Sequence, residues 1–294
     1  MYSVYKIMFF LSLALTIAAA VAVAIFGLRL GVDFKGGSVL ELSFAEDRPA
    51  AGDLVKFIDG LAGVNNPAAS PAGDKSVIVR LNEVDEPTHQ KILEAVSQKY
   101  GRVTENRFDS VGPTVGDELK RKSLTAIVVL LFAIAAYIAF VFRKLAKVLS
   151  PWAMSLATVA ALLHDIIIPI GVFALLGRYL GIEISAVFVA AILTILGYSV
   201  SDSVVVFDRV RENVLRLGSR DKFDLVVHQS IMQTLSRSLN TTFTTLLSLI
   251  AIYLFGGETV KYFALALIIG IFLGAYSSIF VAAPILTWWS GRGR

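Results

Sequence analysis

Four ionisable residues within or bordering long apolar segments are the strongest candidates for chemistry in this sequence. His164 and Asp165 interrupt one apolar segment, and Asp202 and Arg237 border two others. An ionisable side chain inside a bilayer is costly, so such residues usually line ion pathways, relay protons or bind substrates. These four side chains are therefore functional candidates.

Asp202 and Arg237 are predicted to lie at the same depth on consecutive helices. Asp202 follows Ile184, the outer end of its helix, by 18 residues, and Arg237 precedes Phe255 by 18 residues. At 1.5 Å per residue, both lie ~27 Å from the outer boundary. Their opposite charges favour an intramembrane ion pair, which could also be a static structural bridge. The alternative is that each residue marks the cytoplasmic end of its helix.

Asp165 is predicted to lie nearer the middle of the membrane. It is 11 residues from Leu176, the outer end of its helix, which places it ~10 Å outside the level of Asp202. In a two-aspartate intramembrane protease the two carboxylates lie close enough to share a proton, so the predicted difference in depth between Asp165 and Asp202 argues against that class. The Gly-x-Gly-Asp motif of such proteases is also missing before Asp202. His164 has two open interpretations, a proton relay or a hydrogen bond to a neighbouring helix.

The remaining composition argues against an enzyme. The sequence has no cysteine, which excludes disulfides, thiolate catalysis and cysteine metal sites. The three histidines are far apart in the sequence, so no metal-ligand spacing is present. No nucleophile, base and orienting residue form a recognisable set, and we expect no cofactor.

Six apolar segments are long enough to carry these residues across a membrane. A bilayer core of ~30 Å needs ~20 apolar residues in a helix. The six segments are Ile7–Leu28, Ser123–Phe142, Ser150–Gly177, Ile184–Ser201, Ser238–Gly257 and Tyr262–Gly291. The first could be a signal peptide, but its 22 residues exceed the usual ~7–15 and favour a retained anchor. Gly270 and Gly274, in the last segment, indicate close helix packing.

Lysines and arginines in the short loops predict the orientation. The side with more of them should be cytoplasmic. One side holds Lys6, Arg143, Lys144, Lys147, Arg209, Arg211, Arg216, Arg220, Lys222, Arg237, Arg292 and Arg294. The short loops of the other side hold only Arg178 and Lys261. Both termini and the loops 143–150 and 208–235 are therefore predicted to be cytoplasmic. The net charge of +4 follows from this asymmetry and does not indicate nucleic-acid binding.

Residues 29–122, between the first two segments, are predicted to form an extracytoplasmic domain. They hold 28 of the 50 charged residues of the chain, as expected for a water-soluble region. The glycine spacing of Gly112–Gly116 is that of a phosphate loop, but Asp117 replaces the required lysine. A turn leading into the second apolar segment explains these residues better. The domain shows no catalytic set and is expected to contact another molecule.

The apolar periodicity of this domain predicts a small α+β fold of the ferredoxin-like type. Alternating apolar residues indicate strands and a spacing of three or four indicates helices. The predicted elements are strand 40–44, helix 54–61, strand 77–81, helix 86–100 and strand 103–108. Asp53 is predicted to cap the first helix. Asn65–Gly73, which is rich in proline, alanine and glycine, is predicted to be a loop.

Five motifs in order along the chain resemble the SecF members of the SecD/SecF family. They are Gly31–Gly37, Val111–Gly116, Leu162–Asp165, Gly197–Asn213 and Ser236–Thr242, the last followed by Leu254–Gly257. The resemblance covers essentially the whole chain. The residues that correspond to the family motifs are Asp33, Gly36, Gly37, Gly112, Pro113, Gly197, Asp208 and Arg209.

The resemblance implies a multi-pass α-helical membrane protein with six transmembrane helices, the half-unit of the resistance–nodulation–division (RND) exporters. It implies a SecD partner and a bacterial plasma (inner) membrane. The implied function is accessory preprotein export beside the SecYEG channel and SecA, with YajC and YidC as further partners and membrane lipids around the helices. The coupling ion, H⁺ or Na⁺, is left open.

The resemblance also implies that Asp202 and Arg237 take part in proton use, with Asp165 and His164 as further candidates. We expect Arg237 to keep Asp202 ionised until a proton arrives from outside, after which the unpaired charge makes the helices repack. The residues 29–122 would move with the helices. Two alternatives remain, a proton-coupled exporter of lipids or small molecules and a passive scaffold that only assembles a complex.

Overall fold

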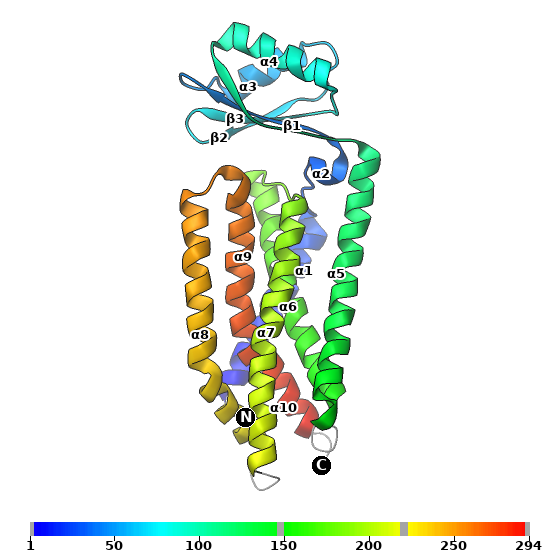
Figure 1. Ribbon diagram of the computed structural model, residues 1–294, viewed down its shortest axis with the longest axis vertical. Helices are drawn as coiled ribbons and strands as arrows, with labels where there is room; N and C mark the ends of the chain where they lie inside the picture. Colours follow the sequence, from blue (N-terminus) through cyan, green and yellow to red (C-terminus); the bar gives the residue numbers. More distant parts are fainter. Residues whose placement is uncertain (1–2, 146–149, 218–222, 292–294) are drawn as a thin grey trace. The chain divides into compact units, whose positions relative to one another are not determined.

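The computed structural model describes residues 3–145, 150–217 and 223–291 (Figure 1). Two compact units divide the chain. The helical unit comprises residues 1–29, 125–183 and 187–294, and the sheet unit comprises residues 30–124 and 184–186. Five cations of the orientation prediction lie outside the described residues: Lys147, Arg220, Lys222, Arg292 and Arg294.

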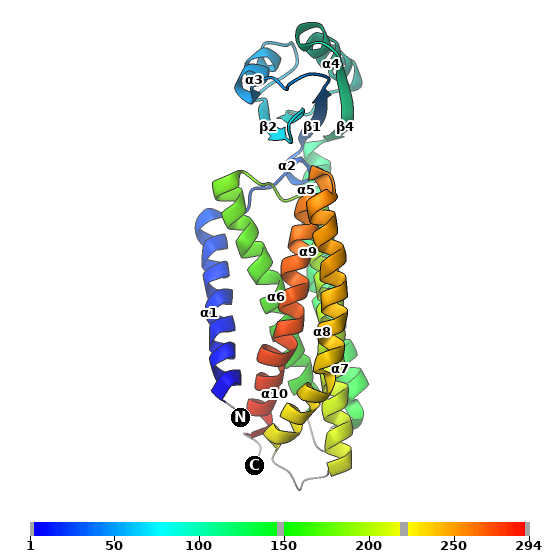
Figure 2. The same cartoon turned by 90° about the vertical axis from the view of Figure 1, so that its left-hand side faces the viewer.

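Six long apolar helices form the described part of the helical unit, which confirms the predicted number of spans. They are α1 (Ser3–Phe26), α5 (Pro113–Val141), α6 (Pro151–Leu180), α7 (Ala186–Leu217), α8 (Phe223–Phe255) and α9 (Glu258–Ser277). The 3₁₀ segment η1 (Phe142–Leu145) follows α5, and the π-helical segment η3 (Ser278–Ala282) and α10 (Ala283–Gly291) continue α9. The two chain ends lie at the same end of this unit (Figures 1 and 2).

The segment 208–235, expected to be a loop, is mostly helical. It continues α7 and begins α8, with only residues 218–222 outside the described chain. Ion pairs one turn apart support the added turns, with 2.7 Å between Arg209 and Glu212 and 3.1 Å between Arg211 and Asp208. The sequence-based boundary was wrong because it followed apolarity, and a helix continues beyond its apolar part when its charges pair.

The sheet unit has the predicted ferredoxin-like arrangement. Its elements are α2 (Val32–Lys35), β1 (Gly37–Phe44), α3 (Ala51–Asp59), β2 (Ala68–Ala72), β3 (Ser76–Leu81), α4 (Glu86–Tyr100) and β4 (Val103–Val111). The strands form one antiparallel sheet in the order β2-β3-β1-β4. α3 and α4 cover one face of it (Figures 1 and 2). The core between them is apolar and contains Leu40, Leu42, Leu54, Ile58, Val77, Val79, Ile92 and Val96.

Two details of this unit differ from the prediction. The expected loop Asn65–Gly73 contains β2, in which Pro71 pairs with Val77. Proline is tolerated there because β2 is an edge strand, where one side of the strand needs no hydrogen-bond donor. Asp53 is not the N-cap of α3, since that helix already begins at Ala51. An acidic residue in the first turn is still favourable to the helix dipole.

Candidate functional site

Asp165 lies at the centre of a buried polar cluster that joins three helices. It is fully buried midway along α6, and its Oδ1 is 2.8 Å from Nδ1 of His164. Its Oδ2 accepts hydrogen bonds from Ser199 Oγ of α7 at 2.5 Å and from Ser277 Oγ of α9 at 2.7 Å. A buried carboxylate requires such partners. We call His164, Asp165, Ser199 and Ser277 the Asp165 cluster.

His164 extends this cluster toward α1. Its ring stacks on Tyr276, with ring centroids 6.1 Å apart, and Tyr276 Oη donates a hydrogen bond to the carbonyl of Met8 at 3.0 Å. Ser12 Oγ donates to Tyr276 Oη at 3.1 Å. His164 Nε2 is buried without a hydrogen-bond partner in the described part of the chain. His164 therefore contacts Asp165 through Nδ1, and neither of its two predicted roles, a proton relay or a hydrogen bond to a neighbouring helix, is decided by these contacts.

Two helix irregularities lie next to the Asp165 cluster. Pro169, one turn after Asp165 in α6, has no backbone N–H to donate to the Asp165 carbonyl. The π-helical segment η3 begins directly after Ser277. Proline and π-helical turns are common causes of helix bending, and π-helical turns are frequent at functional sites. The helices that hold Asp165 are therefore locally weakened where they meet.

Close packing of α9 on α7 brings Ser277 and Ser199 to the same carboxylate. A Cβ on Gly274 would lie 3.0 Å from the Cβ of Ser199, and a Cβ on Gly270 would overlap the side chain of Ile195. The prediction of close helix packing at Gly270 and Gly274 is therefore confirmed. Gly197 differs, because a Cβ there would meet no atom within 4 Å.

Asp202 forms a second polar contact, between α7 and α8. Its side chain is 7% exposed, and its Oδ1 accepts a hydrogen bond from Ser238 Oγ at 3.3 Å. Its Oδ2 is buried and has no hydrogen-bond partner among the described residues. The carboxylate therefore keeps one oxygen for a proton or for a further partner.

The predicted ion pair between Asp202 and Arg237 is not formed among the described residues. Ser238 contacts Asp202 instead, and Arg237 is exposed. Consecutive residues of a helix point ~100° apart, so Ser238 meets Asp202 while the neighbouring Arg237 enters the cavity beside α7 without bonding to that carboxylate. Counting residues gave similar depths for both groups, but it could not determine which face of α8 meets Asp202.

Asp165 lies closer to the level of Asp202 than the sequence predicted. Asp165 contacts Ser199, which precedes Asp202 by three residues, or ~4.5 Å along the helix. The predicted separation of ~10 Å was too large, because it assumed upright helices and ignored side-chain length. Different serines hold the two carboxylates, and no hydrogen bond joins them in the described chain.

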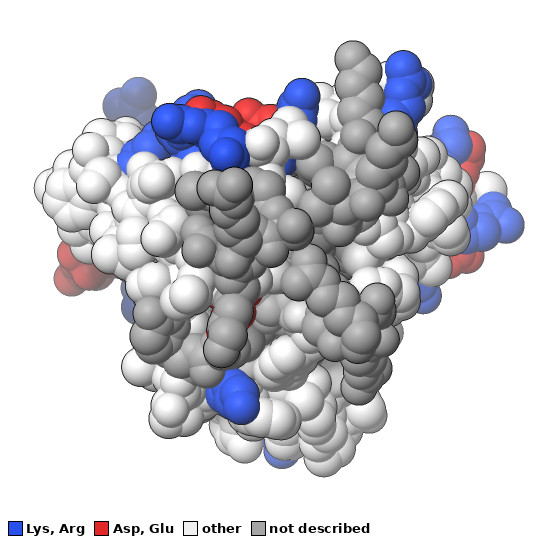
Figure 3. Space-filling model, turned by 90° about the horizontal axis from the view of Figure 1, so that it is seen from below, with Lys and Arg blue, Asp and Glu red and all other residues white. Residues whose placement is uncertain are grey.

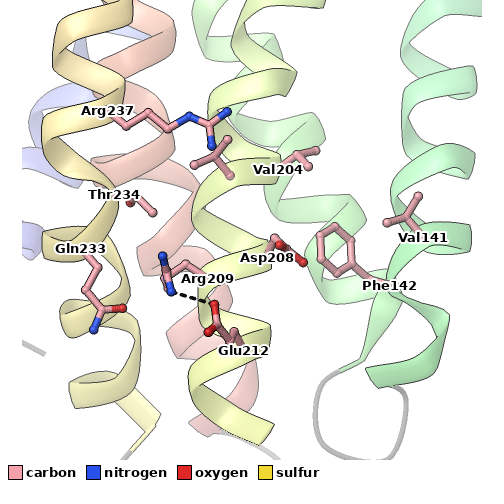
Figure 4. Close-up of a pocket in the computed structure, with 10 residues that line it drawn as sticks. Val141, Phe142, Val204, Asp208, Arg209, Glu212, Gln233, Thr234 and Arg237 are labelled. Carbon is pink, nitrogen blue, oxygen red and sulfur yellow. Dashed lines mark hydrogen bonds and ion pairs between the residues drawn. The ribbon is translucent and has the colours of Figure 1, made fainter. Parts of the chain in front are cut away.

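A cavity of about 260 Å³ lies between η1, α5, α7 and α8 (Figure 4). Its lining residues are Val141, Phe142, Val204, Val205, Asp208, Arg209, Glu212, Gln233, Thr234 and Arg237. Figure 4 shows the Arg237 side chain extending from α8 toward α7, with Asp208 and the Arg209–Glu212 ion pair farther along the cavity. The cavity therefore places charged side chains next to the helix segment that carries Asp202.

A patch of mixed charge lies on the end of the helical unit at which α7 ends (Figure 3). Seen from below, Lys and Arg side chains gather along one edge, with Asp and Glu beside them (Figure 3). The last turns of α7 contribute Arg209, Arg211 and Arg216, which pair with Asp208 and Glu212. Neighbouring opposite charges indicate a water-exposed helix end, where each ion pair stabilises the fold by little.

Family models and relatives agree on what this chain resembles. The model described as protein export membrane protein SecD/SecF, C-terminal, matches residues 91–292, and the SecD/SecF GG motif matches residues 21–47. The protein named protein translocase subunit SecF from Thermobaculum terrenum is 40% identical over 97% of this chain and 92% of that protein. The chain belongs to the SecD/SecF family.

Some longer relatives contain a region that is similar to this chain. This chain is 38% identical to protein translocase subunit SecDF of Brucella abortus, covering 94% of this chain and 36% of that protein. A crystal structure of SecDF, a translocon-associated membrane protein from Thermus thermophilus, matches with a TM-score of 0.85 and 31% identity. The match covers 99% of this chain and 39% of that chain. The SecDF proteins are thus more than twice as long as this one.

The GG motif of the SecD/SecF family lies in a tightly packed junction of the sheet unit. Gly36 has φ +77°, and a Cβ there would lie 2.8 Å from Cα of Pro113. Gly37 has φ +123°, and its Cβ would lie 2.7 Å from the carbonyl oxygen of Leu81. Both positions therefore require glycine. The turn expected at residues 112–116 is not formed, because β4 ends at Val111 and residues 113–116 already belong to the first turn of α5.

Sequence reasoning identified the acidic residues of this SecD/SecF member but missed their polar partners. Ser199, Ser277 and Ser238 are the groups that hold the two carboxylates. A weak signal was present, since Ser199 precedes Asp202 by three residues and so shares its helix face. Serine is common in membrane helices, and only the packing shows which serines face a carboxylate.

Proposed function

We propose that this chain is the SecF subunit of a protein translocase and that it works with a SecD partner. Family membership and the nearly end-to-end match to proteins named SecF support the first part. The SecDF relatives, of which this chain spans 36% and 39%, support the second. Relatives named as translocase subunits point to transport and not to an enzyme.

We further propose that an ion gradient drives this subunit through Asp202. The observation that carries this step is a buried carboxylate with one serine partner and one free oxygen, beside the Asp165 cluster. A proton that binds the free oxygen removes a buried charge. The hydrogen bond from Ser238 of α8 to Asp202 of α7 then loses its charged acceptor, which weakens the contact between the two helices. A proton falling through 100 mV supplies roughly 2.3 kcal/mol, which is enough to bias a two-state element.

The second part of the proposal is that Arg237 replaces Ser238 as the partner of Asp202 in another state of the protein. The guanidinium extends into a cavity whose far end carries Asp208 and the Arg209–Glu212 pair. In one state Ser238 contacts Asp202, and rotation or sliding of α8 would present Arg237 instead. The Asp165 cluster lies one turn away and would keep α6, α7 and α9 together as one body that moves relative to α8.

The proposed setting is the bacterial plasma (inner) membrane, with both termini cytoplasmic and residues 29–122 outside. The shared end of the two termini and the arginines of α7 near that end support this orientation. SecYEG and SecA are the proposed translocation partners, with YajC and YidC as further candidates and a preprotein as substrate.

The test compares Asp202→Asn with Asp74→Asn in the full chain with its SecD partner in proteoliposomes. Preprotein release is measured with and without a gradient, using a pH gradient in one arm and a Na⁺ gradient in the other. Asp202→Asn should abolish the gradient stimulation. Asp74→Asn, which changes an exposed carboxylate in the turn between β2 and β3, should retain it.

Stimulation by a gradient in Asp202→Asn equal to that of the unchanged chain would contradict ion coupling through this residue. If SecD still co-purifies with that variant, the result supports a passive scaffold. Release that is unaffected by either gradient, together with gradient-driven export of a lipid or small molecule, would support the exporter alternative.

A further inference from the structure

Asp33 of the GG motif caps α7, a helix that begins 153 residues later. Residues 30 and 184 form a parallel β-bridge, and the N–H of Gly31 donates to the carbonyl of Ile184 at 2.9 Å. Asp33 lies two residues after Gly31, and its Oδ2 accepts a hydrogen bond of 2.7 Å from the backbone N–H of Ala186. Ala186 is the first residue of α7.

This contact has the chemistry of a strong helix cap. The first four N–H groups of a helix lack partners within the helix, and an acidic side chain there also interacts favourably with the helix dipole. A carboxylate that accepts from a backbone N–H forms a charge-assisted hydrogen bond, roughly twice as strong as a neutral one. Caps normally come from the residue just before the helix, whereas this one comes from a distant segment.

Asp33 is held firmly to the rest of the sheet unit. It lies in the short helix α2, which the close-packed Gly36 and Gly37 follow. Gly116 of α5 approaches the same segment, since a Cβ on Gly116 would lie 3.0 Å from the N atom of Gly36. Substitution of these glycines would push the segment away from Pro113 and Leu81. Asp33 and Ala186 both belong to the sheet unit, so the cap joins the first residue of α7 to a tightly packed part of that unit.

α7 is also the helix that carries the contacts of the proposed coupling site. Ser199 and Asp202 follow Ala186 by 13 and 16 residues, or ~20 and ~24 Å along the helix. A shift or rotation of α7 at Asp202 moves its first turn as well, because a helix of this length transmits displacement along its axis.

We infer that Asp33 is a positioning residue that transmits the movement of α7 to the sheet unit. This inference rests on the proposed function, because it assigns the path by which a charge change at Asp202 reaches the sheet unit. Without the cap, α7 would still respond to a proton, but in the described part of the chain only the bridge between Leu30 and Ile184 would link the start of α7 to the sheet unit, which would follow the helix less.

The experiment uses the full chain with its SecD partner and a distance readout that does not depend on translocation. The chain has no cysteine, so Asp74→Cys in the β2–β3 turn and Leu215→Cys near the end of α7 accept spin labels specifically. The label-to-label distance is compared between the unchanged chain and Asp202→Asn. We expect Asp202→Asn to change this distance when residue 33 is aspartate. When the chain also carries Asp33→Ala, Asp202→Asn should change the distance little or not at all.

Preprotein release provides the second readout. Asp33→Ala should lower the gradient-stimulated rate by ~5-fold or more, the lower range of typical coupling between sites. Asp33→Asn keeps an acceptor oxygen without the charge, so its gradient-stimulated rate should lie between those of the unchanged chain and Asp33→Ala. Asp85→Ala is the matched control, because Asp85 caps α4 inside the sheet unit by accepting from the N–H of Thr88 at 3.1 Å. The control should retain full gradient stimulation.

A covalent replacement separates transmission from simple stability. Asp33→Cys combined with Ala186→Cys should restore gradient stimulation when the disulfide forms, as verified by mass spectrometry, and lose it on reduction. An unchanged distance shift in Asp33→Ala, or equal losses in Asp33→Ala and Asp85→Ala, would overturn the inference while leaving Asp202 as the coupling residue. Gradient stimulation that survives in Asp202→Asn would instead overturn the proposed function.

Discussion

The two units of this chain both bury apolar side chains, but they differ in where they place charged groups and exposed apolar groups. The sheet unit buries leucine, isoleucine and valine between its sheet and two helices and leaves most of its charges exposed. The helical unit fully buries Asp165 among serines and a histidine and leaves Phe243 and Phe255 63% and 87% exposed. Water around the first unit and lipid around the second explain the difference, because apolar exposure is unfavourable only in water.

The largest test of this contrast removes the buried carboxylate of the helical unit. Asp165→Ala leaves Ser199, Ser277 and His164 without their acceptor, and we expect a loss of ~3–5 kcal/mol, typical of breaking a buried polar set. Asp208→Ala changes an exposed carboxylate and should cost less than ~1 kcal/mol. Thermal unfolding of the purified chain in detergent measures both, and equal melting temperatures would contradict a structural role of the Asp165 cluster.

A pair of identical substitutions, one in each unit, gives the next largest effect. Leu40→Ala opens a cavity in the apolar core of the sheet unit and should cost ~2–5 kcal/mol. Leu15→Ala, at an exposed position of α1, should change stability by less than ~0.5 kcal/mol. Hydrogen exchange in the full chain localises each loss. Equal destabilisation by both would show that Leu15 is buried in the native assembly.

The smallest effect concerns the cap of α4 and its pH dependence. Hydrogen bonds from Thr88 lower the pKa of Asp85 below its usual 3.8. A lowered pKa in the folded state means that the cap stabilises the sheet unit above the unfolded value and loses this contribution as the pH falls through the folded value. Asp85→Ala should therefore lower the melting temperature at neutral pH and converge with the unchanged chain in acid. A constant difference across pH would contradict the cap.

Much of the fold was predictable because its signals are local. Apolar length predicted six spans, and alternation predicted the strands around Leu40 and Val77. The failures were also local in origin. β2 was missed because proline is typical of loops and is compatible with a strand only at the edge of a sheet. The end of α7 was predicted too early because its last turns are charged, and only the structure shows that these charges pair.

The sequence by itself determined which segments cross a membrane, which region folds in water and which ionisable residues are out of place in lipid. It determined these because length, periodicity and charge act within one segment. Only the tertiary structure decided the partners: Ser199 and Ser277 for Asp165, Ser238 in place of Arg237 for Asp202, and Ala186 for Asp33. Each of these contacts joins segments far apart in the chain, and helix rotation and packing set which side chains meet.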